Sequence, residues 1–248
     1  MSEELYLFLD SESVGFFQNS PAKFSTVFNT PIELSNNIEN YEIGVNKLVV
    51  SSHALNVTDG EFHFYSVALG STVASRIPEG QYNIPDGLTT AFTTAIHPDS
   101  DTYILTYDDA VRKFMLQTKN EQCMISFSNN LQKLMGFPPA VTGLGITFAQ
   151  QSWDPTGGYQ NFYVHCDNVE PSYLGNEKQP VLAVFPYMGN YNAPDQIFYE
   201  PSNIAYFPLL RKSFQSIEIQ IKNFKDEFLS FPQGSQTVIV LHIRPGRL

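Results

Sequence analysis

Apolar and polar residues alternate in several short segments of the chain, which predicts a fold made mainly of β-strands. The segments 161–167 and 217–221 each carry an apolar residue at every second position. A period of two is typical of a strand with one buried face and one face toward water. Two further segments, 181–185 and 237–243, are apolar at nearly every position, as expected of strands that are covered on both faces.

The segments 161–167 and 181–185 predict a hairpin near the middle of the fold. Turn-forming residues separate them, including Glu170-Pro171 and the run 174–177. Further strands are expected at 5–9, 24–34, 41–51, 62–67, 144–149, 197–199 and 204–207. About eight to ten strands with long loops and few helices are typical of a single jelly-roll sandwich, so we expect an all-β fold of this kind.

The pattern changes between Ile77 and Pro138. Apolar residues at helical spacing, with Asp86 as N-cap, predict an amphipathic helix that ends near His97-Pro98. Three short strands follow, at 102–107, 111–117 and 122–127, and then a short helix from Ser128 to Gly136. We therefore expect a jelly-roll sandwich in residues 1–76 and 139–248, with a small inserted α+β unit at 77–138.

Composition narrows the class of protein. The chain has 248 residues, of which 42% are hydrophobic, 14% aromatic and only 16% charged. A low charged fraction suggests that part of the surface is covered by other copies of the chain. The formal net charge of −11 argues against specific binding of nucleic acid, which requires a basic stripe. No apolar run is long enough to predict a membrane span.

Cysteine usage and the first residues predict synthesis in the cytosol or nucleus. Cys123 and Cys166 are far apart in the sequence, and neither belongs to a CxxC motif, so no disulfide framework or zinc site is expected. The opening residues lack the pattern of a signal peptide. Asn56-Val57-Thr58 matches a glycosylation sequon, which we interpret as accidental without a secretion route.

The histidines and cysteines of the sequence predict no catalytic site and no metal site. The five histidines are His53, His63, His97, His165 and His242. None forms the closely spaced pair that a cupin metal site requires, so hydrogen-bonded strand histidines are expected. His165 and Cys166 are adjacent on a strand and point to opposite faces, which argues against a Cys/His nucleophile. We expect no enzyme activity and no cofactor.

Several sequence blocks resemble the penton-like minor capsid proteins of Maverick/Polinton elements, adintoviruses and virophages. The blocks occur in matching order over nearly the whole chain, and only their combination is specific. They are Tyr41–Val45, Ile77–Tyr82, Leu134–Pro138, Tyr163–Pro171 with Leu174–Asn176 after it, Ile217–Ile221, Phe231–Gly234 and Val240–Pro245.

The resemblance implies a structural protein of an icosahedral virion. In that family a single jelly roll forms homopentamers at the fivefold vertices, and the inserted unit projects outward. The expected partners are other copies of the chain, the major capsid protein and a possible host receptor. The expected location is the capsid of the virion.

Four aromatic residues are candidates for subunit contacts. Trp153, in the loop 150–159, could anchor an interface or fold over the end of its own sandwich. Tyr159, Tyr187 and Tyr191 lie in loops that are aromatic and low in charge, which suits contact with a neighbouring subunit. Two alternatives to a capsid role remain open: a jelly-roll module that binds a host glycan or receptor, and a cupin-like enzyme, which the missing metal ligands disfavour.

Overall fold

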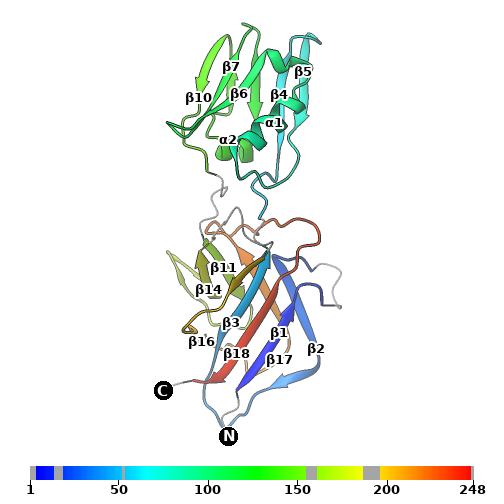
Figure 1. Cartoon of the computed structure of the whole chain (residues 1–248). Coiled ribbons are helices and arrows are strands. Elements are labelled where there is room, and N and C mark those ends of the chain that lie inside the picture. Colours follow the sequence, from blue (N-terminus) through cyan, green and yellow to red (C-terminus); the bar gives the residue numbers. More distant parts are fainter. Residues whose placement is uncertain (1–3, 14–18, 52–53, 155–160, 187–195, 247–248) are drawn as a thin grey trace. The chain divides into compact units, whose positions relative to one another are not determined.

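The computed structural model describes residues 4–13, 19–51, 54–154, 161–186 and 196–246. The chain divides into two compact units, shown in Figure 1. Unit 1 comprises residues 1–54 and 159–248, and unit 2 comprises residues 55–158. Each unit has a hydrophobic core of its own.

Unit 1 is a sandwich of two antiparallel sheets. Its eight principal strands are β1 (Leu5–Asp10), β2 (Lys23–Glu33), β3 (Tyr41–Ser51), β11 (Asn161–Cys166), β14 (Val181–Pro186), β15 (Gln196–Tyr199), β17 (Ser213–Lys222) and β18 (Val238–Pro245). One sheet has the order β1-β18-β3-β15, with β16 (Phe207–Pro208) also paired to β3, and the other has the order β14-β11-β17-β2.

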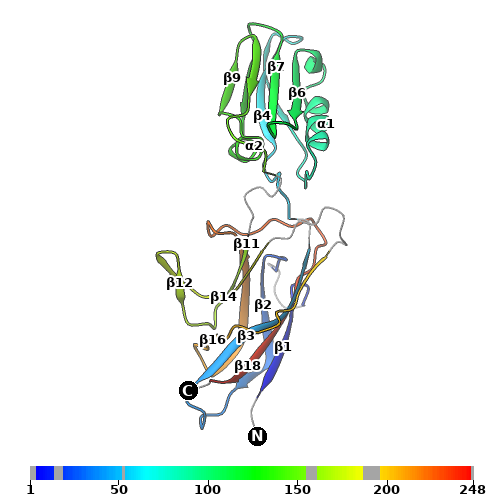
Figure 2. The same cartoon turned by 60° about the vertical axis from the view of Figure 1, so that its left-hand side comes forward.

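This strand order is that of a jelly roll. Counted along the chain, the strands of one sheet are the first, eighth, third and sixth, and those of the other are the fifth, fourth, seventh and second. Two interlocked Greek keys produce such an order. The expected all-β jelly-roll fold is therefore confirmed. A small hairpin of β12 (Ser172–Leu174) and β13 (Glu177–Gln179) stands beside β14, as Figure 2 shows.

The core of the sandwich consists of the inward residues of both sheets. On β17, Ile217, Ile219 and Ile221 are fully buried, as their alternation predicts. On β3 the alternation changes at a bulge, because Val45 pairs with Leu241 while the next pair is Lys47 with Val240.

Unit 2 contains two smaller sheets and two α-helices. Its elements are β4 (Glu61–Ser66), β5 (Ser71–Arg76), α1 (Pro85–Ala95), the 3-10 helix η1 (Asp99–Asp101), β6 (Tyr103–Asp108), β7 (Lys113–Thr118), β8 (Met124–Phe127), α2 (Asn129–Met135), β9 (Ala140–Thr142) and β10 (Gly145–Phe148). The sheets have the orders β5-β4-β8-β9 and β10-β7-β6. Leu88 and Phe92 of α1 are fully buried in the core of this unit.

Local sequence signals account for both helices. Helix α1 begins at Pro85, whose missing N–H costs nothing at the first position, so Asp86 lies in the first turn and not at the N-cap as predicted. Helix α2 has the predicted limits: the Ser128 hydroxyl accepts a hydrogen bond from the Leu131 N–H, and Gly136 adopts the left-handed conformation at the C-terminus.

The two compact units have boundaries that differ from the predicted 77 and 138. Strands β4 and β5 precede residue 77, yet β4 pairs with β8; β10 follows residue 138, yet it pairs with β7. The segments 62–67 and 144–149 were assigned to the sandwich on their local pattern and belong instead to unit 2. Strand pairing between distant segments decides the boundary, and the local pattern contains no information on such pairing.

Candidate assembly surface

The outer face of the sheet β1-β18-β3-β15 carries exposed aromatic residues. Leu7 and Leu9 of β1 point into the core, so Tyr6 and Phe8, which alternate with them along the strand, point outward. Their exposed fractions are 47% and 74%, and Phe198 of β15 is 63% exposed. An antiparallel sheet that faces water normally has polar residues on its outer face.

In the second sheet of the same sandwich, strand β17 has polar residues on its outer face. On β17, Glu218 and Gln220 lie between the buried isoleucines and point outward. The Lys23 amine lies 3.8 Å from the Glu218 carboxylate across the ladder with β2. On the face that includes β1, the exposed aromatic residues Tyr6 and Phe8 occupy successive outward positions of one strand. On the side of the second sheet, the exposed Phe228 ring lies next to the amines of Lys23 and Lys222.

A cluster of polar and aromatic groups fixes part of the aromatic face. The Tyr6 ring is stacked on the His242 ring, with centroids 4.4 Å apart, and the Tyr206 hydroxyl lies 2.7 Å from His242 Nδ1. The Arg244 guanidinium lies 3.4 Å from the centre of the Tyr206 ring and pairs with Glu42 at 3.2 Å. These contacts hold Tyr6 and the segment that contains Tyr206 against the sheet.

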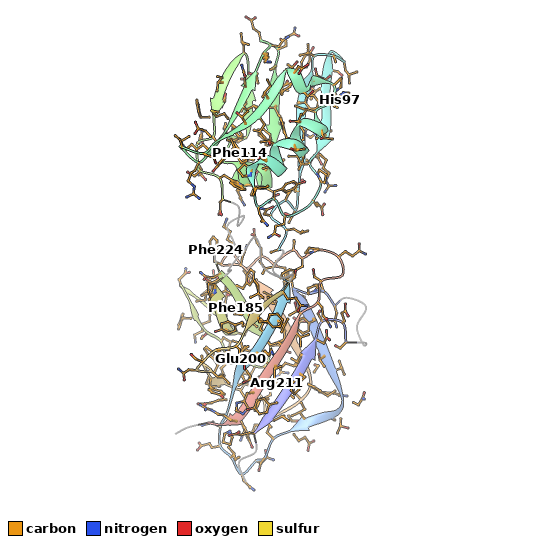
Figure 3. The ribbon with its side chains drawn as sticks, in the orientation of Figure 1. His97, Phe114, Phe185, Glu200, Arg211 and Phe224 are labelled. Carbon is orange, nitrogen blue, oxygen red and sulfur yellow. The ribbon has the colours of Figure 1, made fainter. Side chains whose placement is uncertain are left out.

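Strand β14 lies at the edge of its sheet. The expectation that its apolar run is covered on both faces is wrong at Val184. Val184 is 47% exposed, while Leu182 and Phe185 are buried in the core. The Phe185 ring, labelled in Figure 3, is perpendicular to the Phe162 ring at 5.8 Å and stacks on Tyr199 at 5.0 Å. The described chain thus buries Val181 and Leu182 at the start of β14 and leaves Val184 exposed further along the strand.

An apolar hollow of about 120 Å³ lies beside β14. Among the residues that line it are Val45, Val184, Tyr199, Ala205 and Phe207. The hollow is located between β14 of one sheet and β3, β15 and β16 of the other. The segment before β16 approaches β3 closely, since a Cβ placed on Gly44 would lie 2.6 Å from the Ala205 carbonyl oxygen. Glycine at position 44 permits this approach.

Of the four predicted contact residues, Trp153 lies among the described residues. Trp153 belongs to unit 2, where its ring is perpendicular to those of Tyr107 at 5.6 Å and Phe114 at 6.0 Å. It is partly buried against the core of that unit. Tyr159, Tyr187 and Tyr191 lie outside the described residues, so their role in subunit contacts stays a prediction, as does that of Trp153.

Sequence reasoning missed Phe8 and the hollow. A signal for Phe8 was present, because residues 5–9 are all apolar on a strand that lies at the edge of its sheet. The hollow gave no such signal, since it depends on the separation of β14, β15 and β16 across the sandwich.

The sequon residue Asn56 has a structural role in unit 2. It is 2% exposed, and its side chain bonds twice to the backbone of Tyr82: the amide nitrogen donates to the carbonyl and the oxygen accepts from the N–H, both at 2.8 Å. The Asn130 amide in turn donates to the Asn56 carbonyl at 3.0 Å. The folded unit therefore presents no free Asn56 amide for modification.

His165 and Cys166 lie on opposite faces of β11, as predicted. Cys166 is fully buried in the core, and burial raises the pKa of its thiol to about 12. His165 is on the other face, 4% exposed, and pairs in register with Gln220. Among the described residues no group of three or more His, Cys, Asp or Glu side chains is arranged to hold a metal ion, and His53 lies outside that set.

We predict that neither cysteine reacts in the folded protein. Cys123 and Cys166 are both buried, and the nucleophile in thiol reactions is the thiolate. At pH 8 a colorimetric thiol reagent should modify no cysteine in the native chain and both cysteines in denaturant. Rapid modification of one thiol in the native chain would contradict the burial described for it.

His165 should make unit 1 less stable as the pH falls. Burial, followed by the charge of Lys222, lowers the pKa of His165 below 6.5, while Asp226 opposes the shift. The unfolded chain therefore binds more protons than the folded chain as the pH drops through 6.5 and below, so the free energy of unfolding decreases there. At pH 7.5 the residue contributes no such penalty, because it is neutral in both states.

The variant His165→Gln tests this pH dependence. Its melting temperature should change less between pH 7.5 and pH 5 than that of the unmodified chain. Asp167 does not produce the same trend: burial raises its pKa from 3.8, so acidification favours the folded state through that group. Equal pH dependence of the two proteins would show that His165 is not the group responsible.

The fold and surface define a single jelly-roll protein with an inserted α+β unit and an exposed aromatic face. Two solved structures are similar to it. The mavirus penton protein is 11% identical with a TM-score of 0.47, covering 97% of this chain and 99% of its own. A chain in the 3.5 Å cryo-EM structure of the Sputnik virophage is 12% identical with the same TM-score, covering 98% of both chains.

The likeness to these two structures concerns the fold. No protein-family model matches the chain, and no curated protein matches it either. Among the described residues no helix has the length and hydropathy needed to cross a membrane.

Proposed function

We propose that this chain is a penton-like structural capsid protein that forms homopentamers at the fivefold vertices of an icosahedral virion. The observation that carries the proposal is the position of the ordered sequence blocks in the fold. The block 163–171 begins on β11 and continues past its end, the block 217–221 lies on β17, and the block 240–245 lies on β18, all in the sandwich. The blocks 77–82 and 134–138 lie in unit 2.

The surface of unit 1 supports a role in assembly. Aromatic rings exposed on the outer face of a sheet are unfavourable for an isolated subunit and are typical of surfaces buried by association. The chain has a low charged fraction of 16%, which fits a subunit that shares much of its surface with neighbours. The proposed partners are other copies of the chain and the major capsid protein; contact with a host receptor also stays a prediction.

The oligomeric state of the full-length chain tests the proposal. Light scattering combined with cryo-EM should show rings of five subunits, either for the chain alone or after co-expression with the major capsid protein. A chain that stays monomeric under both conditions and does not enter particles would overturn the proposal. A monomer that bound immobilised glycans would instead support the alternative function, a jelly-roll module that binds a host glycan or receptor.

A further inference from the structure

Unit 1 has two flanks of different shape. Each sheet has two edge strands, and contacts between the sheets place β1 next to β2 on one flank and β14 next to β3 on the other. Figure 1 shows β2 and β14 on opposite sides of the sandwich. A ring of identical subunits brings one flank of each subunit against the other flank of its neighbour, so the two flanks must fit each other.

The β1 flank carries a projecting aromatic side chain. Phe8 is 74% exposed and points outward from an edge strand, beside Tyr6 and opposite Val240 of β18. Single exposed apolar residues are common on protein surfaces. Phe8 differs because an aromatic residue, Tyr6, and an apolar residue, Val240, are next to it, and because an edge strand can be covered by a second chain.

The β14 flank carries the apolar hollow. Its volume of about 120 Å³ is close to that of dry protein cavities that hold a benzene molecule, on the order of 150 Å³. Most of the side chains that line it are apolar, Tyr199 and Asn203 supply polar groups, and Val184 and Ala205 are among the residues exposed to solvent. A phenyl ring suits this hollow in size and in polarity.

We propose that Phe8 of one copy inserts into the hollow between β14 and β16 of the next copy. The proposal rests on the assembly function proposed above and names the contact that would join the subunits. A second copy is favoured as the occupant because this chain supplies both halves of the contact, a projection on one flank and a matching cavity on the opposite flank. Repetition of such a heterologous contact closes into a ring when the rotation per subunit permits it.

Two single variants of the full-length chain remove one half of the contact each. Phe8→Asp places a charge on the projecting side chain, and Ala205→Trp fills the hollow from its lining. Each should raise the concentration at half-assembly about 30-fold or more, as expected for loss of a central aromatic anchor. The melting temperatures should stay unchanged, because both positions are exposed. Phe148→Asp is the matched control, since Phe148 is 52% exposed on β10 of unit 2 and belongs neither to β1 nor to the lining of the hollow.

A mixture of the two variants distinguishes this contact from general destabilisation. Phe8→Asp keeps an intact hollow and Ala205→Trp keeps an intact Phe8, so together they can form one contact per pair. The mixture should give heterodimers that grow no further, whereas each variant alone stays monomeric. Absence of heterodimers from the mixture would overturn the contact, even if each variant alone had lost assembly.

A cross-linking variant supplies positive evidence. Phe8→Cys combined with Asn203→Cys should form disulfides between copies under mild oxidation, giving a ladder of bands that ends at the ring. If the unmodified chain assembles and both Phe8→Asp and Ala205→Trp assemble equally well, the contact is wrong while the assembly function stands. If the unmodified chain assembles neither alone nor with the major capsid protein, both proposals fail.

Discussion

Replacement of Phe162 by alanine is expected to lower the free energy of unfolding of unit 1 by about 4 kcal/mol and to abolish assembly. Phe162 is fully buried on β11, and its ring contacts Phe185, which in turn stacks on Tyr199. Truncation would leave a cavity in the middle of the sandwich. Since Tyr199 also lines the hollow beside β14, the damage would reach the proposed contact surface.

The position of the single tryptophan allows each unit to be followed by its own probe. Trp153 packs in unit 2, so its fluorescence reports unfolding there, whereas circular dichroism reports both units. In Phe162→Ala the dichroism transition should shift to lower denaturant concentration while the fluorescence transition stays in place. The reciprocal variant Phe114→Ala removes a ring next to Trp153 and should shift the fluorescence transition.

Coincident shifts of both probes in both variants would contradict the division into two units. The chain would then unfold as a single cooperative body. The boundaries at residues 54 and 159 would separate two compact units that do not unfold independently of each other.

The sequence predicted those features of the fold that depend on local pattern. The alternation at 161–167 correctly identified Phe162, Val164 and Cys166 as buried, and spacing of 3.6 residues identified α1. Helix α2 was predicted with its correct ends because both signals, a serine cap and a terminal glycine, are chemical and lie within the helix itself.

Features that depend on pairing between distant segments were not predictable. Strand β5 was missed because its sequence, Ser71–Arg76, has small and polar residues on both faces, and it is stabilised by its ladder with β4. The apolar run of β14 was interpreted as doubly covered because periodicity cannot tell whether the second cover comes from the same chain or from another. The proposed contact would explain why the run is apolar at Val184, since a neighbouring copy would cover that residue.

The sequence predicted that the chain makes subunit contacts, but it did not predict that Phe8 and the hollow would form the candidate surface. Low charge and the family resemblance indicated subunit contacts, and loops rich in tyrosine were the natural candidates. Phe8 and the hollow lie on strands and on the short segment before β16. Their exposure follows from the order of the strands at the two flanks, which becomes known only when the sheets are assembled.

Replacement of Asp99 by alanine should destabilise unit 2 by about 3 kcal/mol and leave assembly through unit 1 intact. Asp99 is 4% exposed, and its carboxylate accepts hydrogen bonds from the backbone N–H groups of Val67 at 3.0 Å and Ala68 at 3.1 Å. The Ser66 hydroxyl donates to its other oxygen. One carboxylate thus ties η1 to the turn between β4 and β5, and hydrogen bonds to a buried charged acceptor are stronger than neutral ones.

The variant Asp99→Asn separates the charge from the geometry. Asparagine keeps one oxygen that can accept from the turn, so it should lose about half as much stability as alanine. The Trp153 fluorescence transition measures both losses in unit 2, and the same samples can be tested for rings. If Asp99→Ala unfolded unit 2 at the denaturant concentration of the unmodified chain, the carboxylate would not support the turn. If it abolished ring formation while unit 1 stayed folded, assembly would depend on unit 2 as well, and the contact between Phe8 and the hollow would not suffice to hold the ring together.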